Sequence, residues 1–242
     1  MKILDRYCTR IYFIILILTI SLNESFCFTS VIIDGDSSKI QIEKGKDKFN
    51  FKQLSVPAGL IFSGILMNSN RTESIKNEIV EERNEHIPNF RTHVDDYLQF
   101  SPIAISYGLD AFGIKSKTDF TNRTVILIKG ELVMLGTVYI LKNSIHQLRP
   151  DISNYHSFPS GHTAQAFAAA TFLSEEYKYK FKLMPYLSYG IAGSVGALRM
   201  FNNKHFISDV LVGAGIGYLS MKASYWTHQY KWGRRDPIMK EF

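Results

Sequence analysis

The sequence contains little cysteine and no long apolar run. Only two of its 242 residues are cysteines, Cys8 and Cys27, and both lie within the first 28 residues. A chain cleaved after that segment would therefore need neither disulfide bonds nor a reducing compartment. No stretch reaches the roughly 18 consecutive apolar residues that predict a membrane-spanning helix, and the mean hydropathy is -0.05. These absences favour a soluble or peripheral protein.

Charge of either sign is not concentrated in one segment. The chain carries 28 Lys and Arg against 22 Asp and Glu, which gives a formal net charge of +6. Such a balance suits anionic phosphates or a membrane surface. We expect no nucleic-acid partner, because the basic residues are scattered and no nucleic-acid-binding motif appears. The length and the 45% hydrophobic content suffice for one domain with a sizeable core.

The first 28 residues are typical of an export signal. Lys2, Arg6 and Arg10 precede or flank a twelve-residue apolar stretch at 11–22. The alternative is an uncleaved N-terminal anchor. In both cases we expect the protein to be exported, to the periplasm or the extracytoplasmic face of a membrane, and to be associated with a membrane surface.

The remaining chain is predicted to be all-α, with about six core helices in a bundle. Residues 29–53 show a short mixed pattern and are expected to be extended or irregular. The helical domain is predicted at 54–224, and an aromatic and basic tail at 225–242 resembles a membrane-interface belt. The expected helices cover 56–67, 72–84, 92–100, 101–109, 123–142, 162–174, 183–198 and 207–221.

Several local expectations accompany these helices. The helix at 72–84 is expected to bury Ile75, Ile79 and Val80 as one apolar stripe. The helix at 123–142 is expected to be interrupted at Lys129–Glu131, and residues 175–182 to form a charged connector. The glycines of 183–198 (Gly190, Gly193 and Gly196) predict close helix packing.

The helix predicted at 162–174 starts with the sequence Phe-Pro-Ser-Gly-His-Thr at residues 158–163. Ser160 is a preferred N-cap, and the residues after it carry backbone N–H groups without intrahelical partners. Those groups and the positive end of the helix dipole can bind an anion such as phosphate. Gly161 leaves room for close approach, and His162 lies in the first turn. The alternative for this stretch alone is a capped core helix.

Two cations lie upstream of this stretch. Lys142 and Arg149 are seven residues apart, which places them on one face of a helix that Pro150 is expected to end near Arg149. The alternative is ordinary C-terminal capping by cations. His146, between them, is interpreted as a packing or substrate-contact residue, and His156 as a loop histidine.

A third cation and a His–Asp pair lie downstream. Arg199 is followed by His205 and Asp209, whose spacing of four predicts one helical face. A carboxylate there can accept a hydrogen bond from one ring nitrogen and leave the other free as a nucleophile or base. The commoner alternative for such a pair is a surface contact.

The three clusters together resemble the signature of the type 2 phosphatidic acid phosphatase / vanadium haloperoxidase superfamily. Its first part is matched by Lys142, Arg149 and Pro150, and its second by residues 159–162. Its third part is matched by Arg199, His205 and Asp209, with Leu198 where the family often has Ser. The resemblance covers roughly residues 125–222, and a three-part match at these spacings is specific.

The resemblance implies a metal-independent phosphatase that acts on phosphate monoesters or pyrophosphates, with a phosphorylated lipid as the expected substrate. The phosphate would lie at the N-terminus of the central helix, bound by Lys142, Arg149, Arg199 and the backbone N–H groups of Ser160 and Gly161. The catalytic residues implied are His205 as nucleophile, Asp209 as its orienting carboxylate and His162 as general acid and base.

Two other functions remain open at this point. A vanadate-dependent haloperoxidase would use the same pocket with vanadate as cofactor, and no cofactor is expected otherwise. A non-enzymatic exported helical protein would bind phosphate without turnover. A metal site at His93, Asp95 and Asp96 is not expected, because adjacent carboxylates point to different helix faces. The sequence does not indicate the oligomeric state.

Overall fold

The computed structural model describes residues 49–69 and 74–229. The predicted export signal, most of the predicted irregular segment and the end of the predicted tail therefore lie outside the described residues. Within those ranges every regular element is helical, which confirms the predicted all-α fold. The elements are η1 (Phe51–Leu54), α2 (Ser55–Met67), α3 (Ile75–His86), α4 (Val94–Leu98), α5 (Ser101–Ala111), α6 (Phe120–Ile145), α7 (Gly161–Tyr177), α8 (Met184–Phe201) and α9 (Ile207–Trp226).

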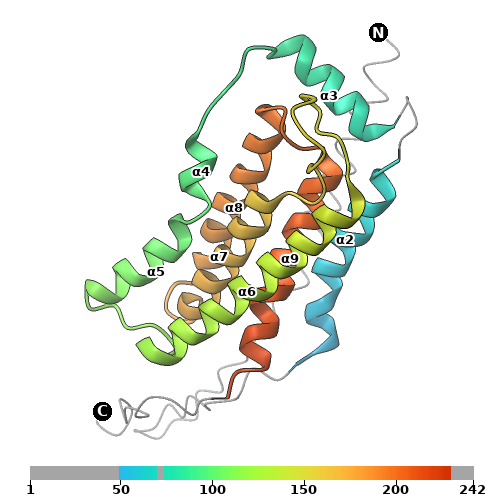
Figure 1. The fold of residues 1–242 in the computed structure, drawn as a ribbon. Helices are drawn as coiled ribbons and strands as arrows, with labels where there is room; N and C mark the ends of the chain where they lie inside the picture. The colour runs from blue at the N-terminus through green and yellow to red at the C-terminus, as the bar shows by residue number, and fades with distance from the viewer. Residues whose placement is uncertain (1–48, 70–73, 230–242) are drawn as a thin grey trace, which may run out of the picture.

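Helix α7 is the centre of the bundle and packs against α5, α6, α8 and α9, while α2 covers the other side of α9 (Figure 1). Its sequence explains this position, because five alanines of α7 are fully buried (Ala164, Ala166, Ala168, Ala169 and Ala170). Small side chains allow four neighbours to approach one helix closely.

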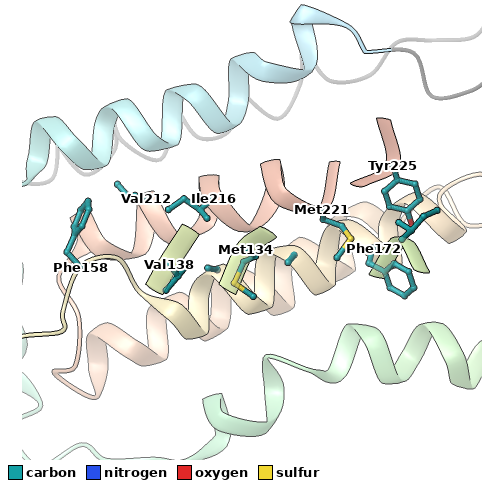
Figure 2. Close-up of a cluster of buried hydrophobic side chains, with 11 residues drawn as sticks. Met134, Val138, Phe158, Phe172, Val212, Ile216, Met221 and Tyr225 are labelled. Carbon is teal, nitrogen blue, oxygen red and sulfur yellow. The ribbon is translucent and has the colours of Figure 1, made fainter. Parts of the chain in front are cut away.

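The largest hydrophobic cluster joins α6, α7 and α9 along their length (Figure 2). Met134 and Val138 of α6 face Val212 and Ile216 of α9, and Phe158 closes the cluster next to the start of α7. This packing fixes the ends of α6 and α9 relative to the first turn of α7.

Glycines of α9 make the contact with α7 possible. A Cβ at Gly213 would lie 2.6 Å from the Ser160 carbonyl oxygen, and one at Gly217 would overlap the carbonyl of Ala164. The glycines of α8 were predicted to pack in this way, but only Gly196 does, against Val210. No atom of the described residues lies within 4 Å of a Cβ position at Gly190 or Gly193.

Several helix boundaries and burial patterns differ from the sequence prediction. Helix α6 runs without interruption through Lys129–Glu131 and ends at Ile145, where His146 adopts a left-handed φ of 43°. In α3 the buried side chains are Lys76 and Arg83, and not the predicted apolar stripe. Ile75 is 39% exposed.

Helix α7 extends through Glu175 and Glu176, which were predicted to lie in a charged connector. Both are buried and paired. Lys222 of α9 donates to Glu175 at 3.0 Å, and the Tyr225 hydroxyl donates to Glu176 at 2.7 Å. Helix α9 accordingly includes the first residues of the predicted tail, because Tyr225 packs inside the bundle.

Candidate active site

The first turn of α7 is capped as the sequence predicts. The Ser160 side chain accepts from the Thr163 backbone N–H at 3.4 Å, and the hydroxyls of these two residues are 2.8 Å apart. The peptide bond between Phe158 and Pro159 is cis. Gly161 and His162, the first two helical residues, have no acceptor within the helix for their N–H groups.

The Ser160 N–H was predicted to donate a hydrogen bond to the phosphate. It donates instead to the backbone carbonyl of Asp209, at 3.0 Å. This bond ties the start of α7 to the first turn of α9. The two N–H groups offered to an anion at this helix end belong to Gly161 and His162.

Lys142 extends from the last turns of α6 to the start of α7. Its Cε lies 3.9 Å from the position that a Cβ of Gly161 would take, and its Nζ donates to the His156 carbonyl at 2.7 Å. The structure thus brings this predicted cation next to the helix N-terminus. His156 contributes its backbone to this contact and leaves its own side chain exposed.

Arg149 reaches the site from a loop, because α6 has already ended at Ile145. The predicted shared helical face with Lys142 is wrong, and backbone bonds within the loop hold Arg149 instead. Its N–H donates to the Asn154 carbonyl, and its carbonyl accepts from Ile152 N–H, both at 3.0 Å. Burial lowers the pKa of Arg149, and the nearby positive charge of Arg199 lowers that pKa further. Two like charges are therefore held close together.

Arg199 lies in the last turn of α8 and is anchored by a carboxylate that the motifs do not include. Its Nη1 donates to Asp95 Oδ2 at 2.6 Å and lies 3.8 Å from Asp96 Oδ1. The Nε atoms of Arg149 and Arg199 are both enclosed without a hydrogen-bond partner among the described residues. Enclosed guanidinium donors of this kind are suited to bind an oxyanion.

His205 lies in the connection before α9 and is 2% exposed. Its Nδ1 is 3.5 Å from Asp209 Oδ2 and has no hydrogen-bond partner in the part of the chain that the structure describes. Because α9 begins at Ile207, the pair spans the helix start and does not share a helical face as predicted. Burial lowers the pKa of His205 to about 4, although the Asp209 charge opposes this change.

Asp209 is held firmly beside that histidine. Its Oδ2 accepts from the Ser157 hydroxyl at 2.5 Å and from the Phe206 N–H at 3.0 Å. Its Oδ1 accepts from Gln147 at 3.4 Å and from Ser208 at 3.2 Å. A carboxylate with this many donors is fixed in position. The structure therefore gives Asp209 the geometry of an orienting group.

His162 pairs with the second α4 carboxylate. Its Nε2 lies 2.8 Å from Asp96 Oδ1, and His93 Nδ1 lies 3.1 Å from Asp96 Oδ2. Asp95 and Asp96 were considered only as metal ligands, and their bonds to Arg199 and His162 were not predicted. No local signal indicates these two bonds, because they join α4 to residues 104 and 66 positions away.

The same carboxylates meet the geometric requirement for a cation site. One ligand atom each from Asp95, Asp96 and His162 lies within 4.8 Å of the others. The predicted divergence of the adjacent carboxylates is therefore wrong. Their oxygens are nevertheless engaged by protein donors, Asp95 with Arg199 and Asn202 and Asp96 with the two histidines.

A cavity of about 320 Å³ opens over this arrangement. Three predicted site residues line it, namely Arg149, His162 and Arg199. The other lining residues are Arg91, Thr92, His93, Asp96, Asn202 and Lys204. The cavity thus extends beyond the motif residues, to an outer side that carries the basic residues Arg91 and Lys204.

Comparison with known proteins gives consistent matches. The family model described as the PAP2 superfamily matches residues 123–233. Lipid A 1-phosphatase of Porphyromonas gingivalis is 34% identical over 156 residues, which cover 64% of this chain and 35% of that protein. Phosphatidylglycerophosphatase B of Bacillus subtilis is 31% identical over 140 residues, which cover 53% of this chain and 67% of that protein. The chain thus spans only about a third of the first of these relatives.

Two solved structures are also similar. Aquifex aeolicus LpxE has a TM-score of 0.48 and 24% identity, covering 62% of this chain and 94% of that one. The transmembrane PAP2 type phosphatidylglycerolphosphate phosphatase of Bacillus subtilis has a TM-score of 0.44 and 21% identity. That match covers 72% of this chain and 94% of the other.

Proposed function

Because this chain belongs to the PAP2 superfamily, we propose that it is a phosphatase that hydrolyses a phosphate monoester or pyrophosphate of a lipid. One observation carries the proposal. Lys142, Arg149, Arg199 and the His205–Asp209 pair come from separate segments and meet at the start of α7. Preorganised positive charge of this kind is commonly the largest contribution to phosphoryl-transfer catalysis.

In the first step His205 attacks phosphorus with Nε2, because its Nδ1 faces Asp209. A phosphorus–nitrogen bond forms and the bond from phosphorus to the leaving oxygen breaks. His162 donates a proton to that oxygen, and the lipid alcohol or phosphate leaves. Asp209 stabilises the positive charge that develops on the His205 ring.

In the second step water attacks the phosphohistidine. His162 takes a proton from the water, the phosphorus–nitrogen bond breaks and inorganic phosphate is released. The three cations offset the charge on the phosphoryl oxygens throughout, so the mechanism as proposed uses no metal and no cofactor. Activity is accordingly expected to persist in the presence of EDTA.

We further propose that the protein works in contact with a bilayer, with the site on the extracytoplasmic side. Among the described residues, α6 is the one helix long and apolar enough to cross a membrane. Its exposed apolar face supports this part of the proposal, as does the lipid named for each relative. A lipid substrate would then reach the cavity without leaving the membrane.

The test is phosphate release from a panel of chain-matched lipid phosphates, lipid pyrophosphates and a water-soluble phosphate ester. The variant His205→Asn is expected to abolish turnover, and Lys142→Ala to raise KM while leaving measurable activity. The matched control is His86→Asn in α3, because His86 is exposed and is not among the residues that line the cavity. Rapid quenching with labelled substrate is expected to trap phosphate on the wild-type enzyme and not on His205→Asn.

Normal turnover by His205→Asn would overturn the mechanism. Phosphate binding without turnover by the wild type, across the whole panel, would favour the non-enzymatic alternative. Halide oxidation with added vanadate and peroxide would favour the haloperoxidase.

A further inference from the structure

The outer side of the cavity is formed by a segment that the catalytic residues do not use. Arg91, Thr92 and His93 lie between α3 and α4 and line the cavity together with Lys204. A phosphate group has only five heavy atoms, and the cavity of about 320 Å³ is within the range of small-molecule sites. The scissile phosphate therefore leaves part of the cavity open on this side.

This segment is held rigidly by its backbone. Arg83 of α3 donates to the carbonyls of Phe90 and Phe201, at 3.1 and 2.9 Å. Asn202 accepts from the Thr92 N–H and donates to the Thr92 carbonyl, both at 2.9 Å. The side chains of Arg83 and Asn202 thus tie the backbone on both sides of Arg91 to the end of α8. Residues 91–93 therefore form a fixed wall of the cavity.

The charge on this wall is positive and only partly balanced. Lys204 pairs with Asp151 at 2.6 Å, and Asp96 is shared between His93 and His162. Arg91 is exposed and forms no ion pair with a carboxylate of the described residues. Within residues 49–69 and 74–229 its guanidinium donates only to the neighbouring Phe90 carbonyl, at 2.7 Å. Its charge also lowers the pKa of Arg83, after the larger effect of burial, so the two cations stand close together.

We propose that Arg91, with Lys204 and His93 beside it, forms a second anion subsite that binds an acidic group of the substrate next to the scissile phosphate. This inference rests on the proposed phosphatase function and narrows its substrate class. The preferred substrates are lipids with two neighbouring acidic groups, such as a pyrophosphate or a second phosphate ester, and not simple monophosphates. Arg91 acts on substrate preference and takes no part in the chemical step.

The experiment compares farnesyl phosphate with farnesyl diphosphate, which differ only in the second phosphate. Arg91→Gln is expected to lower kcat/KM for the diphosphate about five- to tenfold and for the monophosphate less than twofold, since a partly exposed charged hydrogen bond is lost. Arg91→Lys should restore part of the preference. The control is Lys182→Gln, which removes the same charge from an exposed position beyond the other end of α7 and should change neither substrate.

Equal loss on both substrates, or no loss on either, would overturn the subsite. Equilibrium binding separates this inference from the phosphatase function. Titration calorimetry with methylenediphosphonate should show about five- to tenfold weaker binding to Arg91→Gln, with binding of orthophosphate unchanged. If the wild type hydrolyses neither farnesyl compound but this difference in binding is found, the subsite stands and the proposed activity fails. Identical binding by wild type and Arg91→Gln overturns the subsite.

Discussion

His205 is the more enclosed of the two candidate catalytic histidines. Burial lowers its pKa to about 4, against the opposing charge of Asp209, while an unfolded histidine titrates near 6.5. The imidazole is therefore neutral at pH 7, which is the form that a nucleophile requires. Between about pH 6.5 and pH 4 the unfolded chain binds a proton that the folded chain does not. Stability is thus complete above pH 6.5 and falls as the pH decreases through this window.

We expect NMR titration of the histidine rings to show the His205 signal unprotonated at pH 5.5, where a histidine free in solution is mainly protonated. Comparison with His205→Asn assigns the signal. The same variant should lose less stability than the wild type between pH 6.5 and pH 4. A His205 ring that titrates near pH 6.5 would contradict the burial seen here.

Asp96 is expected to act through His162. Burial raises the pKa of Asp96, but hydrogen bonds with His93 and His162 outweigh it, so the pKa of Asp96 lies below its usual value. Burial and the charge of Arg199 lower the pKa of His162, and the Asp96 carboxylate opposes that lowering and so favours the protonated ring. We predict that Asp96→Asn lowers kcat at least about tenfold, with a smaller effect on KM, because the general acid loses its partner.

A double-mutant cycle measures this dependence. If Asp96 acts through His162, Asp96→Asn should change kcat little once His162→Asn is present. Additive effects of the two substitutions would show that Asp96 contributes by another route.

At the scale of helices, the contact of α9 with α7 sets the position of the anion site. A Cβ at Gly213 would lie 2.6 Å from the Ser160 carbonyl oxygen, and backbone cannot yield as a flexible side chain can. Gly213→Ala is expected to lower stability by about 1–3 kcal/mol and to lower activity as well, because the start of α7 must shift. Thermal unfolding and phosphate release check the two effects.

The matched control is Gly193→Ala in α8. A Cβ at Gly193 meets nothing within 4 Å, so the substitution should be neutral or stabilise by up to about 1 kcal/mol. Equal behaviour of the two variants would refute the importance of the α7–α9 contact.

The sequence predicts helices and motif residues well because both depend on neighbouring positions. Ser160 caps α7 as its local pattern requires, and the eight α-helices of the described residues lie near the expected positions. The long-range partners could not be predicted. Arg149 sits in a loop held by Asn154, and Arg199 is oriented by Asp95 from a helix 104 residues earlier. Charged residues were also assigned to solvent by default, although Glu175 and Glu176 are buried once Lys222 and Tyr225 pack beside them.

On the outside of the whole molecule, α6 exposes an apolar face. Four side chains of α6 at helical spacing are each more than half exposed, namely Ile128 (53%), Leu132 (65%), Leu135 (55%) and Tyr139 (71%). The window of α6 that is long and apolar enough to span a membrane is only 22% buried. A core helix of a soluble protein would have this face covered. Composition favoured a soluble or peripheral protein because this helix contains Lys129 and Glu131, which interrupt any apolar run.

We predict that the purified protein floats with phospholipid vesicles in a density gradient, and that the paired substitution Leu132→Lys and Leu135→Lys moves it out of the lipid fraction. A lysine in the centre of a membrane helix costs about 2.5–3.5 kcal/mol, so two such charges shift the partition strongly. Ile75→Lys on α3, at a position 39% exposed, serves as the control and should still float. If a second copy of the chain covers the α6 face instead, the wild type remains in the aqueous fraction as an oligomer. The paired substitution then converts that oligomer to monomers. Gel filtration of that fraction distinguishes the two results, and an aqueous oligomer would remove the membrane from the proposed function while leaving the phosphate site intact.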